Sequence, residues 1–394
     1  MSAIKLLPGI YWVGAVDWNV RAFHGHTYNT KRGTTYNSYL IVDEKIALVD
    51  TVYGPFSDQL LKNIAEIVPL EKIDYVISNH GETDHSGSLA AIKKACPKAK
   101  HYGTAKAKES LQKMYYLDLD FTVVKSGDKL SLGKKTLTFL EAPMLHWPDS
   151  MFTYVIEDAL LLSNDAFGQH YASSERFDDE IEMEALMEEA EAYYANILWP
   201  FSPLVLKKIE EVVAMKLPIK MIAPSHGIIW RKDPMKIVNA YVEWAKNTTR
   251  KKVVIAYETM WKATEKMAYK IADGLISEGV DVKLYDVSVV EHTGIIREML
   301  YAKGFIIGSS THGNGMLPHA AMFLDFLKCM KPKGRIGAAF GSYGWAGGAV
   351  KSIEKILTET GVELIQSGLG LQFTPNTEEE KKCYEFGKEF AKRL

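Results

Sequence analysis

Cysteine is scarce in this chain, and the three cysteines that it has lie far apart, at Cys96, Cys329 and Cys383. An odd number of distant cysteines indicates neither a disulfide framework nor a four-cysteine metal site. The sequence contains no Cys-x-x-Cys pair, and therefore no small cysteine-bound iron module of its own. If the protein performs redox chemistry, its electrons must come from another molecule.

Long apolar runs and an excess of one charge are also missing. No run approaches the roughly 18 apolar residues of a membrane span. The first residues hold one lysine and scattered apolar side chains, unlike a secretion signal or a transit peptide. The formal net charge of −2 gives no basic field that would attract nucleic acid. We expect a cytoplasmic protein with neither a membrane nor a nucleic acid as partner.

The composition is otherwise that of an ordinary globular protein, with 47% hydrophobic and 24% charged residues. A length of 394 residues predicts two domains, because single domains usually span roughly 100 to 200 residues. The segment 244–252, WAKNTTRKK, is charged and lacks an apolar run. We therefore expect domains at residues 1–249 and 250–394.

Short β-branched runs dominate the first domain, which predicts a sheet-rich fold with flanking helices. These runs cover residues 37–42, 46–50, 75–78, 136–141, 160–163 and 219–223. The acidic stretch 178–191 predicts a helix whose charges form a solvated face. After residue 252, strands and helices alternate strictly, which indicates a doubly wound parallel sheet.

The segment His80-Gly81-Glu82-Thr83-Asp84-His85 holds four ligand-capable side chains in six residues. It follows the strand expected at 75–78. In an extended chain His80 and Glu82 point to the same side, whereas Asp84 and His85 can turn away as a helix begins. One metal can therefore take the first pair and a neighbouring metal the second.

Three more candidates follow at or near the ends of later apolar runs, namely His146, Asp165 and His226. A lone histidine at a strand end is more often a hydrogen-bonded polar residue than a ligand. The recurrence of histidines and carboxylates at successive strand ends favours a dinuclear site instead.

This pattern resembles the His-x-His-x-Asp-His loop of the metallo-β-lactamase fold, with Glu82 in place of its second histidine. A metal site with carboxylate oxygens suits redox iron better than a nitrogen-rich site, which is typical of zinc. The whole chain is similar to the flavodiiron proteins, including the rubredoxin:oxygen oxidoreductases. The resemblance implies a metallo-β-lactamase-like αββα sandwich followed by a flavodoxin-like doubly wound sheet. It also implies one iron on His80, Glu82 and His146, a second on Asp84, His85 and His226, and Asp165 as the bridge; family members differ in whether the histidine at the position of His85 is bound.

Four further polar residues are candidates for hydrogen bonds to ligands or for proton supply, namely His24, His26, Asp149 and His170. Ordinary structural hydrogen bonding explains each of them about equally well. We expect His26 and His170 to lie near the reaction pocket and to assist catalysis.

Three loops at strand ends of the second domain are candidates for a flavin site, namely 257–264, 308–315 and 341–348. The first leads into a helix, where backbone N–H groups and the helix dipole favour phosphate, although a threonine there is more often an N-cap. Glycines in the other two let the backbone approach a planar ring that Tyr343 or Trp345 could cover. The arrangement resembles the FMN site of flavodoxins. The expected FMN-binding residues are Thr259, Met260, Trp261, Ala263, Thr264, Ser309, Thr311, His312, Asn314, Gly315, Ser342, Tyr343, Gly344, Trp345, Ala346 and Gly347.

Three positions depart from the flavodoxin pattern. Ala263 stands where a phosphate-binding hydroxyl is common, and Ser310 and Gly313 replace a frequent proline and asparagine. These changes concern the affinity for FMN more than its presence.

The favoured hypothesis is an oxidoreductase that reduces dioxygen to water or nitric oxide to nitrous oxide at the diiron site, with electrons relayed through FMN. The donor could be rubredoxin, another small redox protein or a reduced deazaflavin. One alternative is a dinuclear zinc hydrolase with a regulatory flavodoxin domain. Another is an electron carrier whose first domain only docks partners.

Domains of about 250 and 145 residues have radii of gyration near 18 and 14 Å, so sites at their outer edges could lie roughly 40 Å apart. Electron transfer over that distance would be slow. We therefore expect a head-to-tail homodimer or a dimer of dimers, as the resemblance also implies, in which the flavin of one chain serves the iron pair of the other.

Overall fold

The computed structural model describes residues 2–25 and 27–394. They form two compact units, each with its own sheets and core. The first consists of Met1–Arg21, Thr30–Tyr193 and Pro203–Ala245, and the second of Ala22–Asn29, Tyr194–Ser202 and Lys246–Leu394. None of the helices in the described ranges has the length and hydropathy needed to span a membrane.

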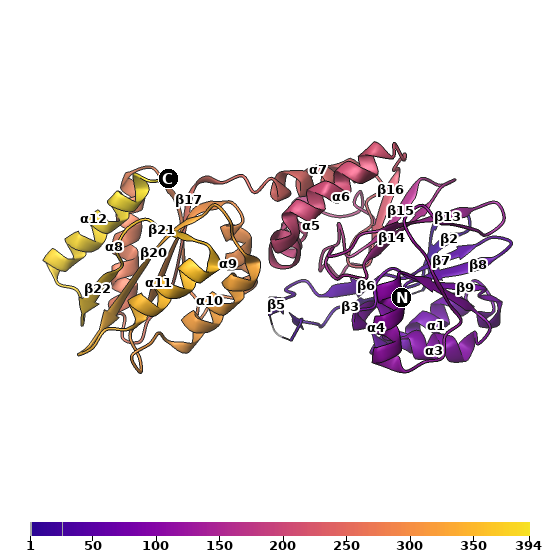
Figure 1. The fold of residues 1–394 in the computed structure, drawn as a ribbon, viewed down its shortest axis with the longest axis horizontal. Helices are drawn as coiled ribbons and strands as arrows, with labels where there is room; N and C mark the ends of the chain where they lie inside the picture. Colours follow the sequence, from indigo (N-terminus) through magenta and orange to yellow (C-terminus); the bar gives the residue numbers. More distant parts are fainter. Residues whose placement is uncertain (1, 26) are drawn as a thin grey trace. The chain divides into compact units, whose positions relative to one another are not determined.

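The first unit contains two large sheets (Figure 1). In spatial order, the seven-stranded sheet consists of β1 (Ile4–Leu7), β2 (Ile10–Trp12), β7 (Tyr39–Val42), β8 (Ile46–Val49), β9 (Tyr75–Ser78), β10 (Lys100–Gly103) and β11 (Phe121–Val123). The five-stranded sheet consists of β12 (Lys129–Ser131), β13 (Thr136–Glu141), β14 (Met151–Val155), β15 (Leu160–Asn164) and β16 (Met221–Pro224). A short pair, β3 (Ala15–Asp17) and β6 (Thr34–Tyr36), completes the unit.

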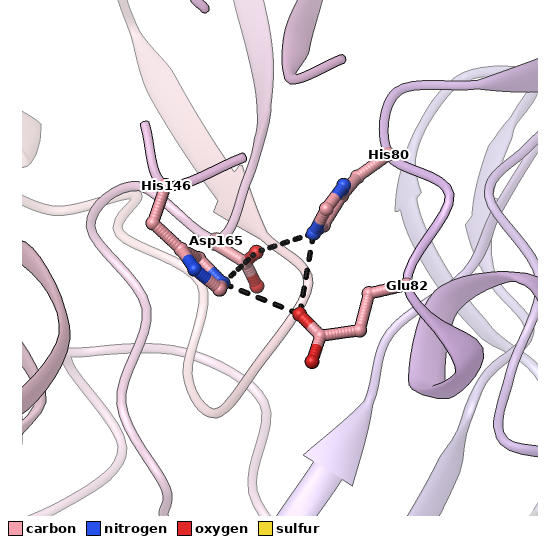
Figure 2. A group of neighbouring side chains, drawn as sticks. All are labelled: His80, Glu82, His146 and Asp165. Carbon is pink, nitrogen blue, oxygen red and sulfur yellow. Dashed lines mark hydrogen bonds and ion pairs between the residues drawn. The ribbon is translucent and has the colours of Figure 1, made fainter. Parts of the chain in front are cut away.

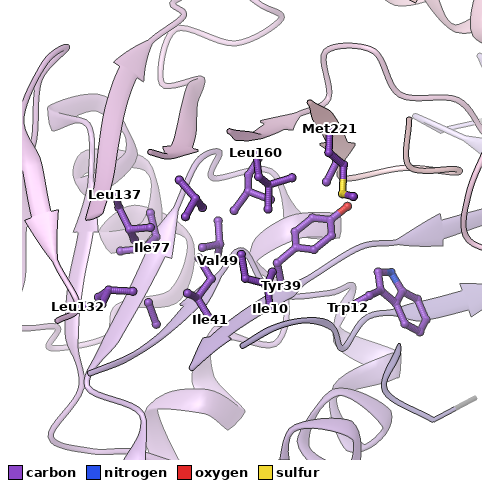
Figure 3. Close-up of a cluster of buried hydrophobic side chains, with 14 of the residues drawn as sticks. Ile10, Trp12, Tyr39, Ile41, Val49, Ile77, Leu132, Leu137, Leu160 and Met221 are labelled. Atoms are coloured by element: carbon purple, nitrogen blue, oxygen red, sulfur yellow. The ribbon is translucent and has the colours of Figure 1, made fainter. Parts of the chain in front are cut away.

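The core of this unit lies between the two sheets (Figure 3). Alternate side chains of β7, such as Tyr39 and Ile41, point into it and meet residues of β13 and β15 such as Leu137 and Leu160. The central strands are buried on both faces, which explains their nearly continuous apolar sequences.

Helices cover the outer faces of the two sheets (Figure 1). Beside the first lie α1 (Ser57–Ala65), α3 (Leu89–Ala95) and α4 (Ala105–Tyr115), and beside the second lie α5 (Met183–Tyr193), α6 (Ser202–Ala214) and α7 (Pro234–Ala245). The order helix, sheet, sheet, helix confirms the expected αββα sandwich. The helix expected at 178–191 begins only at Met183, because the Asp178 side chain is buried and accepts hydrogen bonds from the backbone of Arg231 and Lys232.

The second unit is built on one parallel sheet in the order β18-β17-β19-β20-β21, with β22 also paired to β20. Its strands are β17 (Arg250–Glu258), β18 (Asp281–Asp286), β19 (Ala302–Ser309), β20 (Ile336–Tyr343), β21 (Glu363–Leu364) and β22 (Leu369–Gln372). Helices α8 (Ala263–Ser277) and α12 (Thr377–Ala391) pack together on one face. The other face carries α9 (His292–Met299), α10 (Pro318–Met330) and α11 (Ala349–Thr360). This arrangement confirms the expected doubly wound fold.

Two segments that precede residue 246 in the sequence also belong to the second unit. One is a hairpin of β4 (Ala22–Phe23) and β5 (Tyr28–Asn29), and the other covers Tyr194–Ser202. Both are tied to Thr293, since the Asn29 amide donates to its hydroxyl at 2.9 Å and the Asn196 side chain donates to its carbonyl at 3.1 Å. The second unit is therefore not a single stretch of sequence.

Candidate dinuclear metal centre and flavin cavity

The seven residues proposed as metal ligands come together at the carboxyl ends of four strands. His80 and Glu82 follow β9, His146 follows β13, Asp165 follows β15 and His226 follows β16. The short helix α2 (Thr83–Ser86) begins directly after Glu82 and carries Asp84 and His85. Strand ends that share one edge of a sandwich thus collect side chains from distant parts of the sequence.

The first cluster consists of His80, Glu82, His146 and Asp165 (Figure 2). Its four donor atoms lie within 4.8 Å of one another. The Glu82 Oε2 lies 3.3 Å from the Nε2 atoms of both His80 and His146. The Asp165 Oδ2 faces the same two nitrogens at 3.6 and 3.4 Å. Two nitrogens and two carboxylate oxygens therefore converge on one point.

The second cluster consists of Asp84, His85 and His226, with donor atoms again within 4.8 Å of one another. The Asp84 Oδ2 lies 3.3 Å from the His85 Nε2 and 3.0 Å from the His226 Nε2. The other carboxylate oxygen of Asp165, Oδ1, lies 3.0 and 3.6 Å from the same two nitrogens. Asp165 thus presents one oxygen to each cluster.

The donor atoms of the two clusters are better placed to bind metal ions than to hydrogen-bond with one another. Asp84 Oδ1, His85 Nε2 and both carboxylate oxygens of Asp165 are buried and make no hydrogen bond within the described part of the chain. Buried polar atoms without hydrogen bonds are costly, and a metal ion would satisfy them. Mixed carboxylate and imidazole donors fit divalent iron, so the residues present fit a pair of iron ions.

The protonation equilibria agree with this interpretation. Burial lowers the pKa of His80, but its hydrogen bonds to Asp149 and Glu82 outweigh burial and raise the pKa to about 10. Burial also favours the neutral form of Asp165, yet His85 and His146 hold its pKa well below the usual range. Without metal, protonated imidazoles would face carboxylates at this site, so metal binding would release protons.

Outer partners orient the ligands. The buried Asp149 carboxylate contacts the His80 Nδ1 at 3.0 Å and accepts from the Gly81 amide at 2.6 Å. The His226 Nδ1 lies 2.7 Å from the carbonyl oxygen of Thr35. These contacts direct the Nε2 atoms toward the clusters, which is the usual role of such partners.

The other candidate histidines have different surroundings. His170 is buried, its Nδ1 lies 2.8 Å from the Thr34 hydroxyl, and its ring centre lies 5.0 Å from that of His226. His24 is exposed on the β4–β5 hairpin and belongs to neither cluster. His26 lies outside the described residues.

Tyr193 is a neighbour of the second cluster that the sequence pattern did not reveal. It is buried at the end of α5, with its ring centre 5.1 Å from that of His170 and 6.1 Å from that of His226. Burial and the negative charges of Asp165 and Asp84 raise its pKa well above the ordinary value. The phenol therefore keeps its proton beside the clusters.

A cavity of about 530 Å³ lies at the carboxyl ends of the second unit's strands. Such a volume is typical of pockets for small organic cofactors. Ten of the residues expected to bind FMN line it, namely Met260, Trp261, Ala263, Thr311, Asn314, Ser342, Tyr343, Gly344, Trp345 and Ala346. Ser310, Gly313, Phe373 and Thr374 line it as well. Phe373 and Thr374 were missed because only the pairing of β22 with β20 brings them to this edge.

The other six expected residues support the loops or lie behind the lining. The Thr264 hydroxyl lies 2.9 Å from that of Ser310 and 2.8 Å from that of Ser342. Ser309 accepts from the Leu317 amide, and His312 and Gly315 exchange backbone hydrogen bonds. Thr259 has a buried hydroxyl that makes no hydrogen bond within the described residues, and Gly347 packs beside the Tyr343 ring.

The cavity fits a phosphate-bearing flavin. The Thr259 hydroxyl and the N-terminus of α8 offer groups for a phosphate. The loops touch closely, since a Cβ on Gly348 would lie 2.0 Å from the carbonyl oxygen of Asn314. Trp345 is 93% and Trp261 84% exposed, so both indoles are available to a planar ring.

Fold and sites together define a metal-dependent flavoprotein, and comparisons with known proteins agree. The family model described as ODP family beta lactamase matches residues 34–227, and the flavodoxin model matches residues 255–387. A nitric oxide reductase of Moorella thermoacetica is 52% identical, over 99% of this chain and 98% of that protein.

Solved structures are similar over the whole length of the chain. The rubredoxin oxygen:oxidoreductase of Desulfovibrio gigas is 39% identical, with a TM-score of 0.97 over 100% of this chain and 98% of that one. The flavodiiron protein of Giardia intestinalis is 36% identical, with a TM-score of 0.95 over 100% and 97%. This chain belongs to the flavodiiron protein family.

Proposed function

We propose that the protein is an oxidoreductase that reduces dioxygen to water, nitric oxide to nitrous oxide, or both, at a non-haem diiron centre with electrons relayed through FMN. The observation that carries this proposal is Asp165, whose two carboxylate oxygens face two separate donor clusters. The names of relatives support it, since one is a nitric oxide reductase and another a rubredoxin oxygen:oxidoreductase.

The residues would divide the work as follows. His80, Glu82 and His146 would hold one iron, Asp84, His85 and His226 the other, and Asp165 would bridge them. The metal pair would bind and reduce the small oxidant, and FMN would deliver electrons singly or in pairs. Tyr193 and His170 would present protic groups beside the second cluster. Both reactions consume protons, four per dioxygen and two per pair of nitric oxide molecules, matching four and two electrons.

We further assign the iron to residues 1–249 and FMN to residues 250–394. The donor would be rubredoxin, another small redox protein or a reduced deazaflavin. The exposed aromatic side chains at the flavin cavity, such as Trp345, favour an approach to the flavin from outside. The buried cysteines carry no disulfide, which suits a reducing cytoplasm.

The test measures metal, flavin and gas consumption in one preparation. Protein expressed with ample iron should contain two iron ions and one FMN per chain, and should consume dioxygen or nitric oxide when its flavin is reduced. Stoichiometric zinc with little iron, together with no gas consumption, would overturn the proposal in favour of a hydrolase.

We also propose a head-to-tail homodimer in which the flavin of one chain serves the metal pair of the other. The test combines an Asp165→Ala chain with a chain whose flavin loops are disabled. A heterodimer with one intact site of each kind should regain activity if transfer occurs between chains. An inactive heterodimer with both intact sites loaded, or a fully active monomer, would contradict the arrangement.

A further inference from the structure

Asp50 and Thr51 follow strand β8 and belong to neither metal cluster. Both are buried, and their side chains hydrogen-bond to the segments that carry the proposed ligands. Asp50 Oδ1 accepts from the backbone amide of Asn79 at 2.7 Å, and Asn79 directly precedes His80. Asp50 Oδ2 accepts from the side-chain amide of Asn164 at 3.2 Å, and Asn164 directly precedes Asp165.

The same network reaches the segments that carry the two histidines of the second cluster, His85 and His226. The Asn164 amide also donates to the Ser225 hydroxyl at 3.0 Å, and Ser225 directly precedes His226. Thr51 donates its backbone N–H and its hydroxyl to the carbonyl of His85, at 2.7 and 2.8 Å. One short segment of chain therefore contacts loops that carry ligands of both clusters.

The free-energy cost of burying the Asp50 carboxylate indicates a role beyond packing in the core. A carboxylate buried in a core is expensive unless it accepts several hydrogen bonds, and Asp50 accepts three, two from Asn79 and one from Asn164. Asp50 and Asn164 also adopt left-handed backbone conformations, with φ of 55° and 51°. Asp and Asn tolerate this region better than most residues do. An apolar side chain at position 50 would pack against the loop of Asn79 or that of Asn164. It would not fix the position of one loop relative to the other.

We propose that Asp50 is a positioning residue that sets the spacing between the two donor clusters by hydrogen bonding to the loops of both. The inference rests on the proposed metal pair but concerns metal binding, not gas reduction. Replacing the carboxylate with an amide places an N–H₂ group against the donors of Asn79 or Asn164, so one loop is released.

The experiment titrates metal-free protein with Co²⁺ and follows bound metal by equilibrium dialysis and by the visible absorption of the ion. We expect the wild type to bind two Co²⁺ ions per chain. Asp50→Asn should weaken at least one of the two by about 10- to 100-fold, as losses of outer partners do. The absorption of the remaining bound ion should also change, because its donors have moved.

A matched control separates positioning from general destabilisation. Asn63 is equally buried in the same unit and donates to the carbonyls of Val13 and Gly14, neither of which belongs to a ligand loop. Asn63→Leu should lower the melting temperature but keep both Co²⁺ affinities and the spectrum. The double variant Asp50→Asn, Asn164→Asp restores a donor and acceptor pair between the two positions and should recover part of the lost affinity.

The outcomes distinguish the two hypotheses. A wild type that binds fewer than two ions would count against the metal pair itself. A wild type with two ions and a folded Asp50→Asn variant with unchanged affinities and spectrum would overturn the positioning role alone. If Asp50→Asn fails to fold, Asn164→Gly removes the same link without backbone strain, and unchanged Co²⁺ binding in that variant would overturn the role as well.

Discussion

The metal clusters and the flavin cavity occupy the same kind of place, the carboxyl ends of strands, but they are built differently. The clusters use buried side chains, held by outer partners such as Asp149. The cavity uses backbone loops and aromatic side chains, with Trp345 almost fully exposed. A small ion requires a few donors fixed within fractions of an ångström, whereas a large planar cofactor needs room and surface. Substitutions should therefore act on side-chain chemistry in the first region and on loop shape in the second.

The largest effect is expected for Asp165→Ala, which removes a donor from both clusters at once. Turnover should fall more than the roughly 10- to 100-fold that loss of an outer partner causes. The flavin spectrum should stay unchanged, because Asp165 belongs to the other unit. Iron analysis, gas consumption and the visible spectrum on one preparation check this. Full activity in a metal-loaded Asp165→Ala protein would remove the basis of the proposed reaction.

Gly348→Ala should have the next largest effect, confined to the flavin. The new Cβ would lie 2.0 Å from the Asn314 carbonyl oxygen, so the 308–315 and 341–348 loops must separate. Overpacking of this kind costs about 2 kcal/mol, which corresponds to roughly a 30-fold weaker FMN affinity. Fluorescence titration of the flavin-free protein measures the affinity. Iron content should remain that of the wild type, and an unchanged FMN affinity would show that the loops yield freely.

A third prediction concerns His101, a buried residue of the first unit that belongs to neither metal cluster. His101 is fully buried, and burial lowers its pKa to about 4, below the ordinary 6.5. Between these two pH values the unfolded chain binds a proton at His101 that the folded protein does not bind. The contribution of His101 to the free energy of unfolding is therefore present above pH 6.5 and is lost as pH falls toward 4. Between pH 7 and pH 5 this loss amounts to about 2 kcal/mol. Denaturant unfolding of metal-free wild type and His101→Leu at both pH values should show a smaller decrease in the variant; equal decreases would contradict the assignment.

Trp345→Ala should have the smallest effect of the four. The indole is exposed at the cavity, so its loss removes contact with the flavin ring without disturbing the core. We expect about a 10-fold weaker FMN affinity or an equivalent change of flavin potential, from the loss of about 1.4 kcal/mol of stacking. Redox titration and fluorescence check it. No change in either would place the flavin ring away from Trp345.

The same contrast explains what the sequence could predict. The segment His80 to His85 places chemistry in adjacent residues, and later histidines and carboxylates recur near strand ends, so the two clusters could be proposed without a structure. The alternation after residue 252 likewise predicted the doubly wound sheet. Asp50 could not be identified, because its importance lies in hydrogen bonds to Asn79 and Asn164, which no spacing reveals.

Other misses have similar physical causes. Phe373 reaches the cavity only because β22 pairs with β20 across an intervening helix and strand. The acidic stretch from residue 178 looked like a solvated helix, yet Asp178 is a buried acceptor for a distant loop. Tyr193 ends a helix with no local feature that distinguishes it from a core aromatic. Each of these roles is assigned by tertiary contacts.

The composition of the second unit limits how the protein can be rearranged. Its Thr293 receives hydrogen bonds from Asn29 and Asn196, both far upstream in the sequence. A fragment that starts at residue 250 would lack these donors and leave that end of α9 uncovered. A chimaera that exchanges the flavin-bearing part as one continuous block should therefore be less stable to unfolding. A chimaera that also transplants Ala22–Asn29 and Tyr194–Ser202 should keep its stability. Over evolutionary time, substitutions in α9 should be followed by compensating changes in those two upstream segments.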